Sequence, residues 1–103
     1  MVPFKEEIDN VKNQIINICN PFKIILFGSC ATGSARDDSD IDLCIICDYE
    51  DKQKLLTELL INVDYERDVD FILYRPEEWE VYKEDTTTFA NLIYRKGIII
   101  YGR

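Results

Sequence analysis

Apolar residues recur along the chain in two patterns, at helical spacing and in short unbroken runs. Between residues 8 and 18 they lie three or four positions apart, which predicts an amphipathic helix over residues 3–20. Asn20 and Pro21 end this helix, because the residue before a proline avoids helical dihedral angles. The chain therefore opens with a helix that has one apolar face.

Four apolar runs predict β-strands. They span residues 23–27, 40–47, 68–74 and 98–101. The first run has no polar alternation, which is typical of a strand buried on both faces. In the third run Asp68 and Asp70 share one face, because side chains alternate along a strand.

Further helices are predicted between these strands. They comprise a short helix opened by the turn at residues 28–33, one over 51–61, a small one that begins at Pro76, and a last one over 86–96 with Gly97 just past its end. The resulting order, α-β-α-β-α-β-α-α-β, predicts a single α/β or α+β domain over residues 1–103.

Length and charge narrow the class of protein. The 103 residues suit one compact domain rather than two. The net charge is −8 and there is no histidine, so a basic surface for duplex DNA or RNA is not expected. No apolar run approaches the ~20 residues that span a membrane, and the charged first ten residues do not resemble a signal peptide. We therefore expect a cytoplasmic protein that does not act at a membrane.

Two of the four cysteines, Cys44 and Cys47, form a C-x-x-C pair of the kind found in zinc and redox sites. Positions three apart on a strand face opposite sides, and the sequence has no second ligand pair or histidine to complete a zinc site. We therefore interpret the cysteines as reduced, buried structural thiols.

A glycine-serine turn follows the first predicted strand. Gly28 permits a tight turn and lets a phosphate approach the backbone, and Ser29 adds a hydroxyl donor. Gly28 and Gly33 have the spacing of a Walker-type phosphate loop, but Ser34 stands where that loop requires lysine. The three-glycine pattern of dinucleotide-binding proteins also fails. Taken alone, the turn fits an ordinary loop as well as a phosphate site.

Acidic residues gather at the start of the second predicted strand. Asp40 and Asp42 are two positions apart, so on a strand their carboxylates share a face and repel each other unless a cation lies between them. With Asp38 they alternate as in a calcium loop, but Leu43 stands where an EF-hand needs glycine. We favour magnesium ligands, and a solvated acidic turn is the alternative.

A third carboxylate, Asp70, lies in the otherwise apolar third strand, where a charge is costly unless it is paired or metal-bound. If that strand neighbours the second, Asp70 can join Asp40 and Asp42 around one or two metal ions. Asp68 shares its face and is the rival candidate, but it is nearer a loop, where exposure explains it more easily.

Together these features resemble the minimal nucleotidyltransferases, a branch of the superfamily related to DNA polymerase beta. The resemblance is carried by Gly28-Ser29-x-Ala31-x-Gly33, Ser39-Asp40-x-Asp42-Leu43, Val69-Asp70-Phe71 and the closing segment 95–101. It implies a polymerase-beta-like fold, with helices packed against a mixed sheet of about four strands. It also implies Mg²⁺-dependent transfer of AMP from ATP to an acceptor hydroxyl.

The resemblance assigns roles by position. Asp40 and Asp42 would hold the Mg²⁺ ions of a two-metal site, and Asp70 would complete that site and help to deprotonate the attacking hydroxyl. Gly28 and Ser29 would hold the triphosphate of ATP.

One part of the phosphate turn departs from the family. Many relatives carry arginine or lysine between the serine and the second glycine, whereas this chain has Cys30 and Thr32. Arg36 is the nearest cation and a candidate for the phosphates, and Ser39 is a further candidate for nucleotide contact. The alternative for Arg36 is a solvated arginine that pairs with a neighbouring aspartate.

The resemblance also suggests a partner. The acceptor it implies is a tyrosine of a helical HEPN-type toxin, which would make this chain the antitoxin, and the acidic charge is compatible with a basic partner. Two alternatives stay open: neutralisation of the partner by binding with little turnover, and transfer to a small molecule. The apolar run at 98–101 leaves a homo-oligomer open as well, because an unprotected sheet edge can pair.

Overall fold

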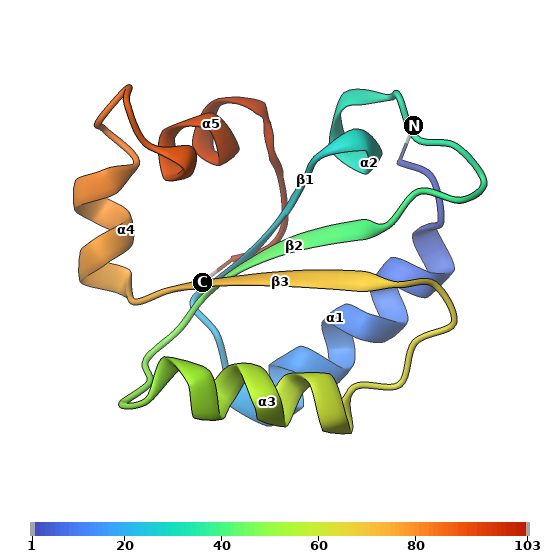
Figure 1. The fold of residues 1–103 in the computed structure, drawn as a ribbon, viewed down its shortest axis with the longest axis horizontal. Helices are drawn as coiled ribbons and strands as arrows, with labels where there is room; N and C mark the ends of the chain where they lie inside the picture. The colour runs from blue at the N-terminus through green and yellow to red at the C-terminus, as the bar shows by residue number, and fades with distance from the viewer. Residues whose placement is uncertain (1, 103) are drawn as a thin grey trace.

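The computed structural model describes residues 2–102, so the two end residues of the predicted domain lie outside the described part of the chain (Figure 1). The elements are α1 (Lys5–Cys19), β1 (Lys23–Phe27), α2 (Ser29–Thr32), β2 (Ile41–Ile46), α3 (Lys52–Asn62), β3 (Val69–Tyr74), α4 (Pro76–Tyr82), α5 (Phe89–Lys96) and β4 (Ile98–Gly102). They follow the predicted order, and the predicted fold class is confirmed.

The strands form one four-stranded mixed sheet in the order β3-β2-β1-β4. β1 runs antiparallel to both β2 and β4, whereas β2 and β3 run parallel. A parallel pair needs a crossover rather than a hairpin, and α3 provides it. The second and third predicted strands are therefore neighbours, which is the condition for bringing their aspartates together.

Helices cover both faces of the sheet (Figure 1). On one face α1 and α3 bury side chains such as Ile15 and Leu59. On the other face α4 and α5 bury Trp79 and Ile93. Because the central strands β1 and β2 are largely buried on both faces, they appear in the sequence as apolar runs, and Asp42 is the exception near the start of β2.

Helix α5 begins at Phe89, later than the predicted start at residue 86. The Thr88 hydroxyl caps the helix, because it accepts a hydrogen bond from the Asn91 backbone N–H at 3.1 Å and donates one to the Tyr82 carbonyl at 2.7 Å. Three consecutive threonines offer equivalent caps in the sequence. The contact with α4 decides which of them is used.

The four cysteines are free thiols. Cys44 packs in the core under α4 and α5, and Cys47 packs in the core on the opposite face, as the spacing predicted. Burial raises the pKa of the Cys44 thiol to about 12. These features agree with structural thiols.

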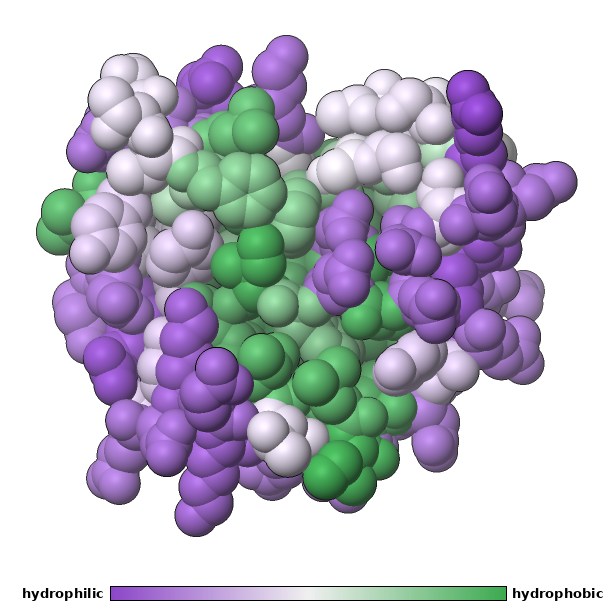
Figure 2. Space-filling view, in the orientation of Figure 1, coloured by the Kyte–Doolittle hydropathy of each residue, from purple (hydrophilic) through white to green (hydrophobic). Residues whose placement is uncertain are grey.

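Apolar side chains also reach the surface. Figure 2 shows them in a band that runs from α5 across the sheet to α3, flanked by hydrophilic side chains. On α4 and α5 the exposed fraction is 67% for Val81, 47% for Phe89 and 52% for Tyr94. Within residues 2–102 no helix has the length and apolar content to cross a bilayer.

Strand β4 lies at an edge of the sheet, where the sequence left self-association open. Its pairing with β1 shifts register between Ile24 and Ile25, and Ile99 is 57% exposed. An irregular edge strand pairs less readily with another copy than a flat one does.

Candidate active site

Strand register brings the turn, the second strand and the third strand to one point of the sheet. In the parallel pair Asp42 lies opposite Asp70, and in the antiparallel pair Asp42 lies opposite Phe27, the last residue before Gly28. Side chains opposite one another in a sheet point to the same face. Asp42, Asp70 and the Gly28 turn therefore meet on the face covered by α4 and α5.

The carboxyl groups of Asp42 and Asp70 interact directly. Burial, the hydrogen bond with Asp70 and the negative charges of Asp70 and Asp40 together raise the pKa of Asp42 to about 6, with burial the largest cause. Two carboxylates this close repel each other when both are ionised, and a cation between them relieves that repulsion. This corner of the sheet therefore favours a positive charge.

Gly28 is the residue that lets the turn approach Asp42. Its backbone has φ 73° and ψ −154°, a conformation that residues with a side chain rarely adopt. A Cβ atom built at this position would lie 2.2 Å from Oδ2 of Asp42. The backbone carbonyl of Gly28 then accepts hydrogen bonds from the N–H groups of Ala31 and Thr32, which close the short helix α2. The glycine predicted as part of a phosphate turn thus contacts the predicted metal ligand.

Asp40 lies just before β2 and is exposed. Its backbone carbonyl accepts a hydrogen bond from the Cys30 thiol at 3.5 Å, which connects it to α2. Its charge contributes to the raised pKa of Asp42, so the two predicted ligands act on each other.

Asp70 belongs to the site for a different reason from the one expected. The sequence argument assumed a buried carboxylate, but Asp70 is exposed on the outer strand β3. Asp70 lies beside Asp42 because the two residues are opposite each other in the parallel pairing of β2 and β3. The rival Asp68 precedes β3, and its backbone carbonyl accepts a hydrogen bond from the Ile41 N–H at 2.9 Å.

Arg36 and Ser39 belong to the loop before β2. The Ser39 hydroxyl accepts a hydrogen bond from the Arg36 backbone N–H at 2.7 Å, which forms a local turn. Arg36 is exposed and is not among the described residues that line the cavity beside Gly28 and Asp42. The structure thus gives Ser39 a role in shaping the loop that leads into Asp40.

The donor atoms of this corner suit a divalent cation. Within residues 2–102 no three acidic, cysteine or histidine side chains form a ready-made metal cluster, and the pair in direct contact is Asp42 and Asp70. Carboxylate oxygens are the hard ligands that Mg²⁺ prefers. A divalent ion between the carboxylates of Asp42 and Asp70 would relieve their mutual repulsion, with Asp40 beside it.

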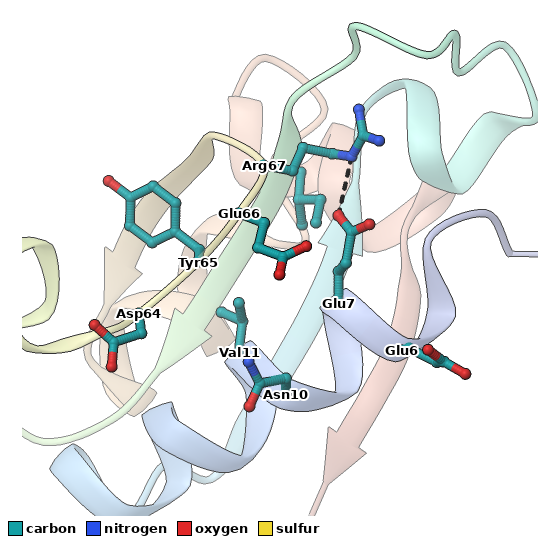
Figure 3. A pocket seen from close by; sticks show the side chains of 9 residues that line it. Glu6, Glu7, Asn10, Val11, Asp64, Tyr65, Glu66 and Arg67 are labelled. Carbon is teal, nitrogen blue, oxygen red and sulfur yellow. Dashed lines mark hydrogen bonds and ion pairs between the residues drawn. The ribbon is translucent and has the colours of Figure 1, made fainter.

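Arg67 is a contributor that the sequence did not indicate. Its guanidinium donates hydrogen bonds to the backbone carbonyls of Asp37 and Ser39, the latter at 3.2 Å. It also pairs with Glu7 at 3.1 Å (Figure 3). Its guanidinium carbon lies 3.5 Å from the centre of the Phe4 ring. Arg67 therefore ties the loop before Asp40 to α1. Its sequence neighbours are acidic, and no local pattern indicates contacts this far away in the chain.

Figure 3 shows the cavity beside this ion pair. It has a volume of about 370 Å³, and acidic side chains of α1 and of the loop before β3 line it together with Arg67. None of the site residues predicted from the sequence is among its described lining residues.

Replacing Arg67 with alanine is expected to loosen the loop that carries Asp40. The loss of its charged hydrogen bonds should lower the free energy of unfolding by about 2 kcal/mol. Amide hydrogen exchange over residues 36–40 should become faster than in the wild type. Arg36→Ala, an exposed arginine in the same loop, is the matched control and should change neither value. Equal urea midpoints for Arg67→Ala and the wild type would contradict this role.

The pKa of Asp42 predicts a pH-dependent effect on stability. A carboxyl with a native pKa of about 6 binds a proton in the folded state at a pH where the unfolded chain has already lost it. Asp42 thus destabilises the metal-free fold at neutral pH, and this cost disappears as the pH falls through 6 towards 4. Asp42→Asn should be more stable than the wild type by about 1 kcal/mol at pH 7.5, after allowance for solvent screening.

Urea unfolding of both proteins in EDTA, at pH 7.5 and at pH 4.5, measures this difference. The other carboxyl groups are common to both proteins, so the difference isolates Asp42. The gain should shrink at the lower pH, and a gain of the same size at both values would contradict the raised pKa.

Comparison with known proteins agrees with this geometry. A family model described as polymerase beta, nucleotidyltransferase matches residues 9–103. A search of the curated proteins finds no match. The matched segment includes the Gly28 turn, Asp40, Asp42 and Asp70, and the family is one of nucleotidyl transfer. Since the match covers nearly the whole chain and the fold agrees with it, this protein belongs to the polymerase beta nucleotidyltransferase family.

Proposed function

We propose that this chain is a Mg²⁺-dependent nucleotidyltransferase that moves AMP from ATP to an acceptor hydroxyl. The observation that carries the proposal is the contact of Asp42 with Asp70, in register on neighbouring strands and beside the Gly28 turn. Carboxylates that repel each other in the free protein can share a cation when a nucleotide binds.

Each of these residues has a role in the proposed reaction. Gly28 and Ser29 bind the polyphosphate, while Asp40, Asp42 and Asp70 would hold Mg²⁺. Bound there, Mg²⁺ would neutralise the phosphate oxygens and favour ionisation of the attacking hydroxyl. The acceptor oxygen bonds to the α-phosphorus, the bond to pyrophosphate breaks, and the hydroxyl proton passes to Asp70. Asp70 suits this role because it is exposed on the outer strand, where an acceptor can reach it.

We infer that the acceptor is a tyrosine of a helical HEPN-type partner. The resemblance to minimal nucleotidyltransferases supports this, as does the acidic charge of the chain. The exposed apolar side chains of Val81 and Tyr94 on α4 and α5 also suit contact with a protein. They lie on helices that cover the face to which Asp42 and Asp70 point.

The test is the position of the transferred label. The protein is incubated with Mg²⁺ and the product of the adjacent gene, or a cell extract, and with ATP labelled at either the α- or the γ-phosphate. A protein band labelled from α but not from γ is expected. Label from γ would indicate phosphoryl transfer instead, and absence of α-label from every acceptor would contradict AMP transfer.

A second candidate function, neutralisation of the partner by contact alone, is favoured by Cys30. This residue is 2% exposed and points into the core, so its position cannot present a cation to a phosphate. The binding function predicts a stable complex whose neutralisation persists after Asp70→Asn. The enzymatic function predicts that neutralisation is lost in the same variant.

A further inference from the structure

An apolar cavity of about 480 Å³ lies between α2 and α5, directly beside the predicted site. Gly28 and Asp42 form part of its lining. The remainder is mainly apolar and includes Phe27, Phe89 and Leu92. The rings of Phe27 and Phe89 meet edge to face, with their centres 5.6 Å apart. A cavity of this size and lining suits a flat organic ring with polar groups at one end.

The cavity lies on the donor side of the site. It is formed over β1, whereas Asp70 is on β3, with β2 and Asp42 between them. Asp70 is not among the described residues that line it. In the proposed reaction the acceptor approaches from the side of Asp70, and the entering and leaving oxygens lie roughly in line across the phosphorus. The side of the site away from Asp70 is thus left to the donor nucleotide, and the apolar lining of the cavity suits its nucleoside better than its charged pyrophosphate.

Lys96, in the last turn of α5, supplies positive charge to this cavity. It is the one cation among the described residues that line it. Thr32, which stands where many relatives carry a cation, lines the same cavity. Lys96 can thus provide from α5 the charge that α2 lacks.

The position of Lys96 is fixed by the next residue. A Cβ atom at Gly97 would lie 2.5 Å from both the Ile25 side chain and the Ile93 carbonyl. Only glycine therefore allows the chain to pass so close to β1 as it leaves α5. This close passage holds the end of α5, and Lys96 with it, against the strand that leads to Gly28.

We propose that this cavity binds the nucleoside of the donor nucleotide and that Lys96 binds its phosphates. The inference rests on the proposed function and adds a specific binding site to it. Apolar walls contact the base and ribose, and the polar end at Gly28, Asp42 and Lys96 receives the phosphate chain.

Two ligands and two variants test the proposal by calorimetry in Mg²⁺. The ligands are α,β-methylene-ATP, which has a nucleoside, and inorganic tripolyphosphate, which has none. Lys96→Gln should weaken the binding of both by about tenfold, because it removes a charged contact. Leu92→Trp places a larger side chain in the cavity. It should weaken the binding of the ATP analogue by at least about tenfold and leave the binding of tripolyphosphate unchanged.

Lys52→Gln, a change of equal charge on exposed α3, is the control and should affect neither ligand. Leu92 is 42% exposed, so its replacement should preserve the fold, and Phe89→Ala gives a second change in the same wall.

If both wall variants bind the ATP analogue as the wild type does, the nucleoside site is wrong and the proposed function stands. If they bind it normally but transfer poorly, the cavity holds the acceptor, and the inference is again overturned. If the wild type binds neither ligand, the proposed function itself fails.

Discussion

Replacing Asp42 with asparagine is expected to lower nucleotidyl transfer at least about 1,000-fold. A metal clamp on the reacting phosphate supplies several kcal/mol of transition-state stabilisation, and each ~1.4 kcal/mol corresponds to a factor of ten in rate. Asparagine keeps the size of the side chain but removes its charge. Asp42 is also the residue that meets both the Gly28 turn and Asp70, so its loss affects every part of the site.

The same substitution should stabilise the metal-free protein at neutral pH, as argued above, so unfolding cannot explain the loss of activity. Initial rates of label transfer from α-labelled ATP measure the effect. Asp70→Asn should cost at least about a hundredfold, whereas its exposed neighbour Asp68→Asn should stay within about twofold of the wild type. Activity of Asp42→Asn above about a tenth of wild type, or equal effects at Asp68 and Asp70, would contradict the assignment.

Gly28→Ala is expected to lower transfer by at least about a hundredfold, although it replaces no charged residue. The added Cβ would lie 2.2 Å from Oδ2 of Asp42, so the carboxylate must move away from the turn. A displacement of about 1 Å at a reacting centre can cost about a hundredfold in rate. The φ of 73° adds backbone strain, and the free energy of unfolding should fall by about 1–3 kcal/mol.

Gly33→Ala separates these two effects. Gly33 also has a positive φ, 84°, but a Cβ there would have nothing within 4 Å. This variant should lose about 1 kcal/mol of stability through strain alone and retain its rate of transfer. Transfer rates and urea midpoints for the two variants show whether the loss of activity comes from the contact with Asp42 or from backbone strain. If Gly33→Ala were as inactive as Gly28→Ala, the contact with Asp42 would not be the reason for the glycine.

The elements of the fold were predictable because their signals are local. Apolar runs mark the central strands, and Asp51 caps α3 by accepting a hydrogen bond from the Lys54 N–H at 3.1 Å. The start of α5 was misplaced because three adjacent threonines offer the same local signal. The contact of Thr88 with α4 selects one of them.

The site was predictable only in part. The sequence identified the Gly28 turn and the aspartates, and left open whether the strands that carry Asp42 and Asp70 are neighbours. Register, which depends on contacts between distant segments, answers that question. Arg67 was missed for the same reason, because it is an ordinary cation in the sequence until the fold places it beside Ser39. The segment 95–101 contributed to the family resemblance, but only the fold places Lys96 in the cavity beside Gly28.

Calorimetric titration with α,β-methylene-ATP, in Mg²⁺ and in EDTA, tests the central claim most directly. The claim is that Asp40, Asp42 and Asp70 hold a nucleotide through a divalent cation beside Gly28. The wild type should bind one nucleotide in Mg²⁺ and at least about tenfold more weakly in EDTA, and Asp40→Asn with Asp42→Asn should abolish the Mg²⁺-dependent part. Binding of equal strength in EDTA, or by the double variant, would contradict it.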